Sequence, residues 1–143
     1  MIYHGDYGLT DLRDVVDEAA KRLAPFAGLR FDSIAVTGLS GLLVGPSVAL
    51  ALSVPLVAVR KASDKHHGSG SRLVGFEDIG RRYLILDDFK SSGATVGRIK
   101  DDIYEHAVSL RLKRPKYAGV YFYGNIPSKR LRWAVGRPIK VAS

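Results

Sequence analysis

The sequence predicts an α/β fold in which helices cover both faces of a parallel sheet. Short, almost wholly apolar runs recur along the chain, as in strands buried on both faces, and they lack the polar alternation of half-exposed strands. Helical patterns separate these runs, and this alternation of elements is typical of parallel sheets. In such sheets ligands bind beyond the carboxyl ends of the strands, so residues that follow a strand are the first candidates for function.

The first element is expected to be a helix near the N-terminus. Thr10 can cap it, and Pro25 and Gly28 are typical of a helix end. The apolar residues between them follow the i, i+3, i+4 spacing of a helix that packs one face on a core. These residues are Leu12, Val15, Val16, Ala19 and Leu23.

Four strands and two more helices are expected after it. Pro46 marks the start or a kink of the first of these helices, because proline has no N–H group for the helical ladder. Residues 61–80 are rich in Gly, Ser and charge and are expected to form a long loop. In chain order, the expected elements are a strand at 33–38, a helix at 41–52, strands at 55–60 and 83–88, a helix at about 94–110 and a strand at 117–123.

The composition is that of a globular domain. With 143 residues, of which 46% are hydrophobic and 25% charged, we expect one domain over 1–143 with its core at about 33–123. The absence of Cys excludes disulfides and thiolate chemistry. The chain has no run of 18 apolar residues and no signal-peptide pattern, so we expect a cytoplasmic protein that does not span a membrane.

The net charge of +8 comes from the C-terminal segment 111–143. It holds nine of the 22 Lys and Arg residues and no acid, whereas residues 1–110 hold the other 13 and all 14 acids. Such a block can bind nucleic acid or a phosphorylated ligand, pair with an acidic neighbour, or form a solvated surface. Its aromatic residues could stack on bases, but the alternation of three tyrosines along the expected strand favours burial of their shared face in the core. These residues are Tyr117, Tyr121, Tyr123 and Trp133.

The most informative stretch is YLILDDFKSSGATV, residues 83–96. Asp87 and Asp88 end a buried strand, and the two carboxylates cannot both face the core, because the burial of unpaired charge is too costly. The hydroxyls, the Gly and the backbone N–H groups that follow, at a helix N-terminus, form an anion cradle. Together these groups suit a ligand with vicinal hydroxyls next to a phosphate, such as a ribose 5-phosphate.

The acid pair has three other interpretations, and the sequence argues against the first two. A Walker B strand would need a G-x-x-x-x-G-K-[ST] loop, which the chain lacks. The acid pair of a phospho-acceptor domain belongs on the first strand of its fold, whereas this pair follows the third expected strand. In the structural alternative, Asp88 only caps the helix or ties down the turn.

LILDDFKSSGAT resembles the phosphoribosyl pyrophosphate (PRPP) motif of the type I phosphoribosyltransferases, which has an apolar strand, two acids, four residues, Gly, any residue and Thr. Asp87 and Asp88 match the acids, and Ala94 stands where the motif usually has a second Gly. The resemblance implies a Rossmann-like phosphoribosyltransferase core in which the two acids hold the ribose hydroxyls. It also implies that the 5-phosphate is wrapped by Phe89, Lys90, Ser91, Ser92, Gly93, Ala94 and Thr95.

LVAVRKASDKHHGSG is similar to the segment of orotate phosphoribosyltransferases that runs from a strand through Arg-Lys into a mobile loop. Arg60 and Lys61 match the Arg-Lys pair, and Lys65 and His67 match the Lys and His of the loop. The resemblance implies that the first two bind PRPP. It also implies that Lys65 and His67 are catalytic residues of a cationic lid, which stabilises the departing pyrophosphate and excludes water. A plain surface loop and a metal site at the adjacent histidines are the alternatives.

VTGLSGLLVGPSVALAL lies where this family keeps its pyrophosphate loop, between a strand and a helix of small residues. Backbone N–H groups there would bind the diphosphate, and related enzymes often have Lys or Arg where this chain has Ser40. The small residues could instead allow tight packing. The N-terminal region that helps to hold the base in orotate enzymes has no recognisable counterpart, so the hood over the core is expected to be abbreviated. The loop residues are Thr37, Gly38, Leu39, Ser40 and Gly41.

By this resemblance we expect an enzyme that moves the 5-phosphoribosyl group of magnesium–PRPP to a nucleobase, an orotate-like pyrimidine, and releases pyrophosphate. Asp87 and Asp88 would hold Mg²⁺ through the ribose hydroxyls or water rather than directly. A homodimer is expected, since the lid of this family often closes over a neighbour's site. Two alternatives stay open. One is a non-catalytic regulator that senses PRPP or a nucleotide and binds nucleic acid through segment 111–143, and the other is a nucleotide hydrolase.

Overall fold

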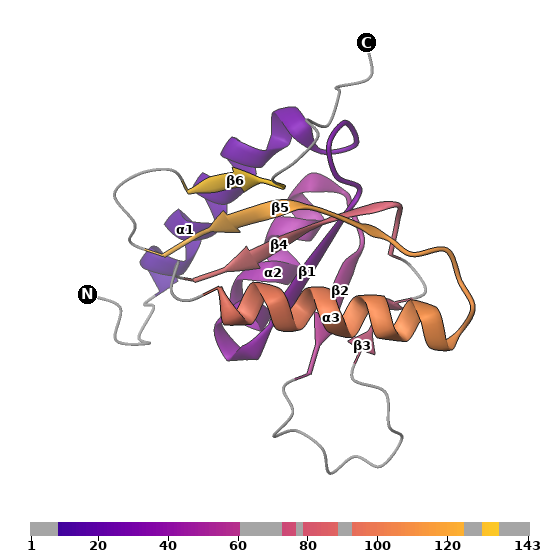
Figure 1. Cartoon of the computed structure of the whole chain (residues 1–143). Coiled ribbons are helices and arrows are strands. Elements are labelled where there is room, and N and C mark those ends of the chain that lie inside the picture. The colour runs from indigo at the N-terminus through magenta and orange to yellow at the C-terminus, as the bar shows by residue number, and fades with distance from the viewer. Residues whose placement is uncertain (1–8, 61–72, 77–78, 89–92, 125–129, 135–143) are drawn as a thin grey trace.

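The computed structural model describes residues 9–60, 73–76, 79–88, 93–124 and 130–134 (Figure 1). Helices and strands alternate along this part of the chain. The elements are α1 (Leu9–Leu23), the 3-10 turn η1 (Ala24–Phe26), β1 (Ser33–Thr37), α2 (Gly38–Leu52), β2 (Leu56–Val59), β3 (Leu73–Val74), β4 (Arg82–Asp87), α3 (Ala94–Ser109), β5 (Lys116–Phe122) and β6 (Leu131–Trp133).

The six strands form one sheet with the order β3-β2-β1-β4-β5-β6. The four central strands are parallel, whereas β3 and β6 pair antiparallel at the two edges. In Figure 1 the arrows of β4 and β5 point to the same side of the molecule. This arrangement confirms the predicted fold class, an α/β fold dominated by a parallel sheet.

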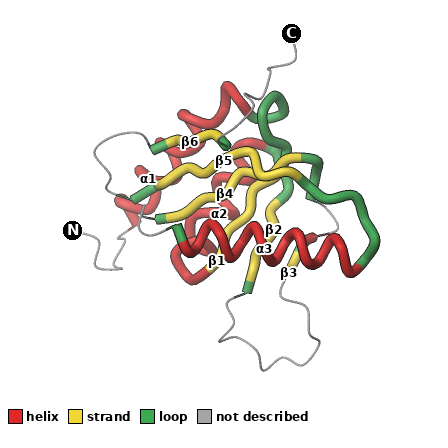
Figure 2. The backbone as a smooth tube through the Cα atoms, in the orientation of Figure 1, coloured by secondary structure: helices red, strands yellow, loops and turns green. Residues whose placement is uncertain are grey.

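Helices cover both faces of the sheet, as Figure 2 shows. The helices α1 and α2 pack on one face, and α3 packs on the other. The side chains of β1 alternate between the two layers, with Ile34 and Val36 in the α1–α2 cluster and Ala35 in the α3 cluster. Because the central strands are buried on both sides, their sequences are apolar runs without polar alternation.

Two glycines bring α2 close to β1. A Cβ atom on Gly41 would lie 3.0 Å from Cβ of Val36, and one on Gly45 would lie 2.8 Å from Cγ1 of the same valine. The tight-packing interpretation of the small residues is therefore confirmed for these two positions. Pro46 lies in the middle of α2 and does not mark the start of the helix. Within the described residues, no helix is long and apolar enough to cross a membrane.

Two helix starts and two strands differ from the sequence expectation. The helix α1 begins at Leu9, so Thr10 lies inside it and does not precede it as a cap. The helix α2 begins at Gly38, three residues earlier than expected, because the positive φ of Gly38 (77°) lets the chain turn from β1 directly into the helix. The strands β3 and β6 were not expected, because strands of two and three residues are too short to show a periodicity.

A register shift separates the tyrosines of β5. The pairing of β4 with β5 shifts after Tyr83, so the ladder contains a bulge. Tyr121 and Tyr123 are buried in the α1–α2 cluster, Trp133 packs partly buried against it, and Tyr117 packs on the α3 side. Core packing is confirmed for Tyr121 and Tyr123. The expectation that all three tyrosines share one face is wrong, because the bulge reverses the alternation.

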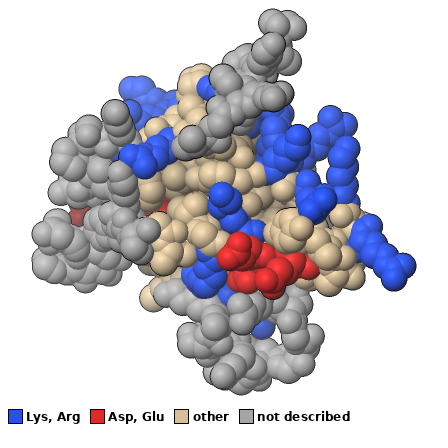
Figure 3. Space-filling view, in the orientation of Figure 1, with Lys and Arg blue, Asp and Glu red and all other residues tan. Residues whose placement is uncertain are grey.

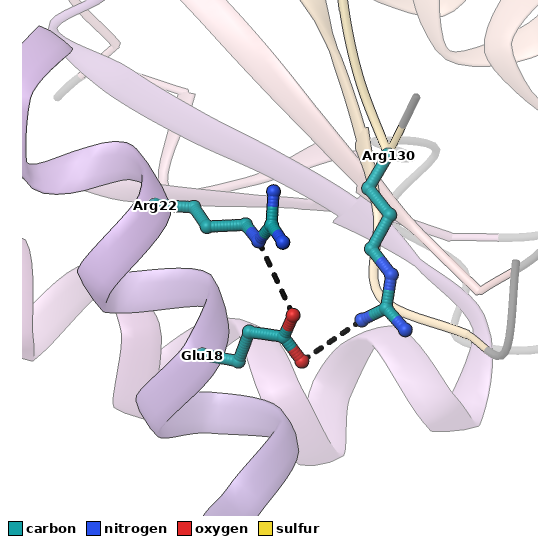
Figure 4. A network of polar contacts seen from close by, with 3 residues as sticks. All are labelled: Glu18, Arg22 and Arg130. Carbon is teal, nitrogen blue, oxygen red and sulfur yellow. Dashed lines mark hydrogen bonds and ion pairs between the residues drawn. The ribbon is translucent and has the colours of Figure 1, made fainter. Parts of the chain in front are cut away.

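An ion-pair network ties α1 to the start of β6 (Figure 4). Glu18 of α1 accepts a hydrogen bond from Nε of Arg22 at 3.2 Å and another from the guanidinium of Arg130 at 2.9 Å. Arg130 directly precedes β6, so the network joins the edge strand to the first helix. Of the interpretations of the basic segment, pairing with an acidic neighbour is therefore confirmed for Arg130.

Candidate active site

The strands β1 and β4 form the switch point of the sheet. The chain leaves β1 toward β2 on one side and leaves β4 toward β5 on the other. Parallel sheets bind ligands beyond the carboxyl ends of strands that diverge in this way. Thr37 ends β1 and Asp87 ends β4, so two of the stretches with predicted site residues meet at this edge.

Backbone hydrogen bonds to the end of β5 hold the acid pair in place. The N–H group of Tyr123 donates to the carbonyl of Asp87 at 2.9 Å, and that of Gly124 donates to the carbonyl of Asp88 at 2.7 Å. The N–H group of Asp88 donates to Oδ1 of Asp87 at 2.9 Å. Both acidic residues are half-buried, so neither carboxyl group is enclosed in the core.

The carboxyl group of Asp87 has an unusual environment. Burial is the main cause that raises its pKa from 3.8 to about 6. A hydrogen bond to the side chain of Asp88 and the negative charge of that side chain also raise the pKa, whereas the backbone N–H of Asp88 and the charge of Arg98 lower it. A carboxyl group that titrates near neutral pH is a candidate for a functional role.

Ser40 links the acid pair to α2 and to the end of β5. Its Oγ lies 3.4 Å from Oδ2 of Asp88 and 2.7 Å from the hydroxyl oxygen of Tyr123. Sequence reasoning assigned Ser40 to the predicted pyrophosphate loop but treated Tyr123 as a core or stacking residue. The position of Tyr123 directly after a strand, at the edge that holds Asp87, was the available signal.

Arg98 brings a positive charge to the same edge. Its guanidinium donates a hydrogen bond to Oγ1 of Thr37 at 3.3 Å, and this hydroxyl donates to the carbonyl of Val59 at 2.6 Å. Arg98 also lies close enough to Asp87 to lower the pKa of that group. Sequence reasoning missed Arg98, because an arginine in the second turn of a helix has no local pattern that separates it from a solvated one.

Two helices begin at this edge, α2 at Gly38 and α3 at Ala94. Both N-cap residues, Thr37 and Gly93, are described, and neither makes a side-chain cap hydrogen bond. The first N–H groups of a helix have no partner within the helix and carry a partial positive charge, so both helix ends can bind an anion. Gly93 has a φ of 86°, a conformation that favours glycine.

Some of the remaining predicted site residues lie near the acid pair, and others lie outside the described residues. Arg60 is half-buried directly after β2, at the same edge as Thr37, and Thr95 lies in the first turn of α3. The side chain of Leu39 is 77% exposed, so it makes little contact with the site. Among the described residues, no three His, Asp or Glu side chains lie together as metal ligands. Lys61, Lys65, His67, Phe89, Lys90, Ser91 and Ser92 lie outside the described residues.

Curated relatives share part of the sequence, whereas no protein-family model matches the chain. The orotate phosphoribosyltransferase of Cenarchaeum symbiosum is 36% identical over 74 residues, which are 52% of this chain and 36% of that protein. The enzyme of the same name from Thermococcus kodakarensis is 37% identical over 81 residues (57% and 40%), and that of Rhizobium rhizogenes is 28% identical over 130 residues (86% and 51%). The chain therefore spans about a third to a half of the length of these relatives.

Solved structures share the architecture. The orotate phosphoribosyltransferase from Aeropyrum pernix has a TM-score of 0.58 and 21% identity, and the match covers 82% of this chain and 60% of that chain. The adenine phosphoribosyltransferase from Saccharomyces cerevisiae has a TM-score of 0.54 and 25% identity, with coverage of 80% and 68%. The chain has the type I phosphoribosyltransferase fold.

The predicted resemblance to type I phosphoribosyltransferases is thereby confirmed at the level of sequence likeness and fold. Within this phosphoribosyltransferase fold, the acid pair lies at the carboxyl end of β4, and the predicted pyrophosphate-loop residues 38–41 form the first turn of α2. Residues 38–40 were expected to precede the helix, which was expected to begin at Gly41, and this expectation is wrong for these three residues. Their backbone N–H groups belong to the N-terminus of α2, where they keep the partial positive charge that an anion needs. The roles of the individual residues stay predictions.

Proposed function

We propose that this protein transfers the 5-phosphoribosyl group of PRPP to a ring nitrogen of a nucleobase and releases pyrophosphate. The observation that carries this proposal is the pair Asp87–Asp88 at the carboxyl end of β4, at the edge where α2 and α3 begin. Two carboxylates beside two anion-binding helix ends suit a sugar with vicinal hydroxyls between a phosphate and a diphosphate. The shared fold supports the same assignment.

The proposed roles follow from the chemistry of the transfer. The bond from the anomeric carbon to the diphosphate oxygen breaks, and a bond from that carbon to the base nitrogen forms. The nitrogen gives up its proton to solvent or to the released pyrophosphate. Negative charge grows on the departing pyrophosphate, and the N–H groups of residues 38–41, together with Arg60, would stabilise it. The start of α3 would hold the 5-phosphate, and the acid pair would hold the ribose hydroxyls.

Magnesium is the proposed cofactor. Mg²⁺ in proteins usually keeps several of its water ligands, and the half-buried carboxyl groups of Asp87 and Asp88 could accept hydrogen bonds from such waters. Bound with PRPP, the ion would neutralise part of the charge on the diphosphate. The acid pair would hold it through the ribose hydroxyls or through water.

The proposed lid rests on the sequence resemblance. Lys61 would bind PRPP together with Arg60, and Lys65 and His67 would act on the departing pyrophosphate. A cationic segment that closes over the site would also exclude water from the reactive sugar. Arg60, at the carboxyl end of β2, is the residue of this set that the structure describes.

An orotate-like pyrimidine is the proposed base, which would place the reaction in pyrimidine biosynthesis. The three curated relatives carry the name orotate phosphoribosyltransferase, and the lid segment resembles that subfamily. The fold alone does not select the base, since orotate and adenine enzymes both match it. Because these relatives are named as enzymes, they favour a transferase over a non-catalytic regulator.

A homodimer is part of the proposal. Four leucines on the outer side of α2 are between 45% and 80% exposed. Their spacing puts them on one stripe of the helix, and a contiguous exposed apolar stripe is typical of an interaction surface. A second copy of the chain is the proposed partner. The stripe consists of Leu39, Leu42, Leu43 and Leu50.

The experiment that tests the function measures pyrophosphate release from magnesium–PRPP with orotate, uracil, purine bases or nicotinate in turn. We expect release that depends on orotate. Asp87→Asn with Asp88→Asn is expected to lower kcat/KM at least about 100-fold, because groups that are pre-organised around the reacting sugar are lost. The matched control, Asp101→Asn with Glu105→Gln, removes two exposed carboxylates of α3 and should keep the activity. Full activity in the acid-pair variant, or no release with any base from folded protein, contradicts the proposal.

A further inference from the structure

A basic cleft lies at the amino ends of the parallel strands, opposite the carboxyl ends that carry the candidate active site. It has a volume of about 680 Å³ and opens between the chain that leads into β4 and the chain that leads into β5. Figure 3 shows Lys and Arg side chains gathered on the side where the connection from α3 to β5 runs in Figure 1. The cationic residues that line the cleft are Arg81, Arg82, Lys113, Arg114 and Lys116.

The cleft is separate from the candidate active site. Arg82 begins β4 and Asp87 ends it, and a strand of this length spans roughly 17–20 Å. Because β5 runs parallel to β4 and Lys116 pairs with Arg82, both strands begin at the same edge. A ligand in the cleft would therefore lie at the amino edge and leave the edge of the acid pair free.

Neutral groups, not carboxylates, orient two of the cations. The guanidinium of Arg82 donates to a backbone carbonyl at 2.7 Å. That of Arg114 donates to the hydroxyl of Tyr104 at 2.8 Å and lies 5.0 Å from the centre of its ring. No ion pair found in the described part of the chain involves a cation of the cleft. The carboxylate of Asp32 accepts hydrogen bonds from the backbone N–H groups of Arg81 and Arg82.

Two of the cations belong to neighbouring strands. Arg82 and Lys116 are direct partners in the pairing of β4 with β5. A ligand with several negative charges would offset the positive charge of the cleft, and a ligand that binds only the folded protein stabilises it.

We propose that this cleft binds a compact oligophosphate, a chain of three or more linked phosphates, free or attached to a nucleoside. The volume lies in the range of small-molecule sites, about 300–1,000 Å³. Linked phosphates concentrate several charges in a small space, and this concentration matches five cations around one cleft. A nucleic acid strand instead spreads its charge along an extended groove. Lys and Arg are both well suited to phosphate oxygens.

An NMR titration of the full chain with inorganic tripolyphosphate at physiological ionic strength locates the binding site. The backbone amide signals of Gly80 and Lys116 are expected to shift saturably. Signals at the other edge, such as Gly38 and Asp88, can shift as well, because that edge is also built for anions. Shifts that are confined to the edge of Gly38 and Asp88 would overturn the proposal.

Charge-matched variants distinguish specific binding in the cleft from the attraction of an anion to the net positive charge of the protein. Lys113→Gln with Lys116→Gln should weaken tripolyphosphate binding at the cleft by about tenfold or more, as followed by the shift of the Gly80 signal. Arg13→Gln with Lys21→Gln removes the same charge from the exposed side of α1 and should change the affinity less than about threefold, since solvent screens distant charges. Equal losses in both pairs would overturn the proposal.

Two further ligands identify the source of the phosphate chain. Tighter binding of ATP than of tripolyphosphate at the Gly80 signal supports a nucleotide, and equal or weaker binding supports an inorganic chain. A short single-stranded RNA that displaces tripolyphosphate and binds more tightly would make the cleft a nucleic-acid site and overturn the assignment to a compact ligand.

Discussion

The carboxyl group of Asp87 sits at the end of a buried strand with a second carboxylate beside it. Its pKa is raised from 3.8 to about 6, mainly by burial. The native state therefore favours the protonated form. The stability that Asp87 contributes is fully present below pH 3.8 and is lost as the pH rises through about 6. At neutral pH the protein carries an unfavourable charge at the place where we propose that ribose hydroxyls bind, and such a conflict is typical of functional sites.

Asp87→Asn keeps the shape of the side chain and removes this charge. At about pH 8 the variant is expected to have a free energy of unfolding higher than that of the wild type by about 1–2 kcal/mol. The difference should shrink as the pH falls through about 6 toward 4, because the wild-type carboxyl group then becomes neutral as well. Urea unfolding of both proteins over this pH range measures the effect. A difference that does not change with pH would contradict the raised pKa of Asp87.

The helix α2 contributes residues both to the core and to the candidate active site. Its first turn carries Ser40, which contacts Asp88 and Tyr123. Its first half packs closely against β1, because Gly41 and Gly45 have no side chains. The distance between helix and strand therefore sets where the N-terminus of α2 lies relative to the acid pair.

Gly45→Ala tests this close approach. The added methyl group would meet Val36 and Leu56, so the free energy of unfolding is expected to fall by about 1–3 kcal/mol. Gly97→Ala in α3 is the matched control. A Cβ atom there meets nothing within 4 Å, and the better helix propensity of Ala should raise the free energy of unfolding by about 0.5–1 kcal/mol. Denaturant unfolding measures both, and effects of the same sign would show that packing against β1 does not govern Gly45.

At the scale of the whole molecule, the apolar stripe of α2 predicts association. Leu50 is 80% exposed and lies at the far end of α2 from the acid pair. Leu50→Glu is expected to convert the dimer into a monomer, because a charge would be buried in the proposed interface. Leu112→Glu, at a leucine that is 51% exposed, is the control and should leave the dimer intact. Sedimentation velocity measures the mass, and a wild-type protein that stays monomeric at high concentration would contradict the homodimer.

Features of the fold that depend on neighbouring residues of the chain could be predicted from the sequence. The four central strands were predictable because burial on both faces leaves an uninterrupted apolar run. The acid pair and the start of α3 were predictable because one stretch, residues 83–96, contains them. The exposed leucines of α2 could not be separated from its buried residues, because the helix is apolar on nearly every side and has no polar face to orient it.

Contacts between residues that are far apart in the chain depend on how the strands and helices pack. The order of the strands brings Arg98 and Tyr123 to the edge of Asp87, and the β4–β5 bulge turns Tyr117 to the face of α3. The parallel pairing of β4 with β5 likewise assembles the basic cleft from two separate segments. These contacts depend on strand order and register, which are set by packing and hydrogen bonds between segments far apart in the chain. A local pattern of residue types does not contain that information.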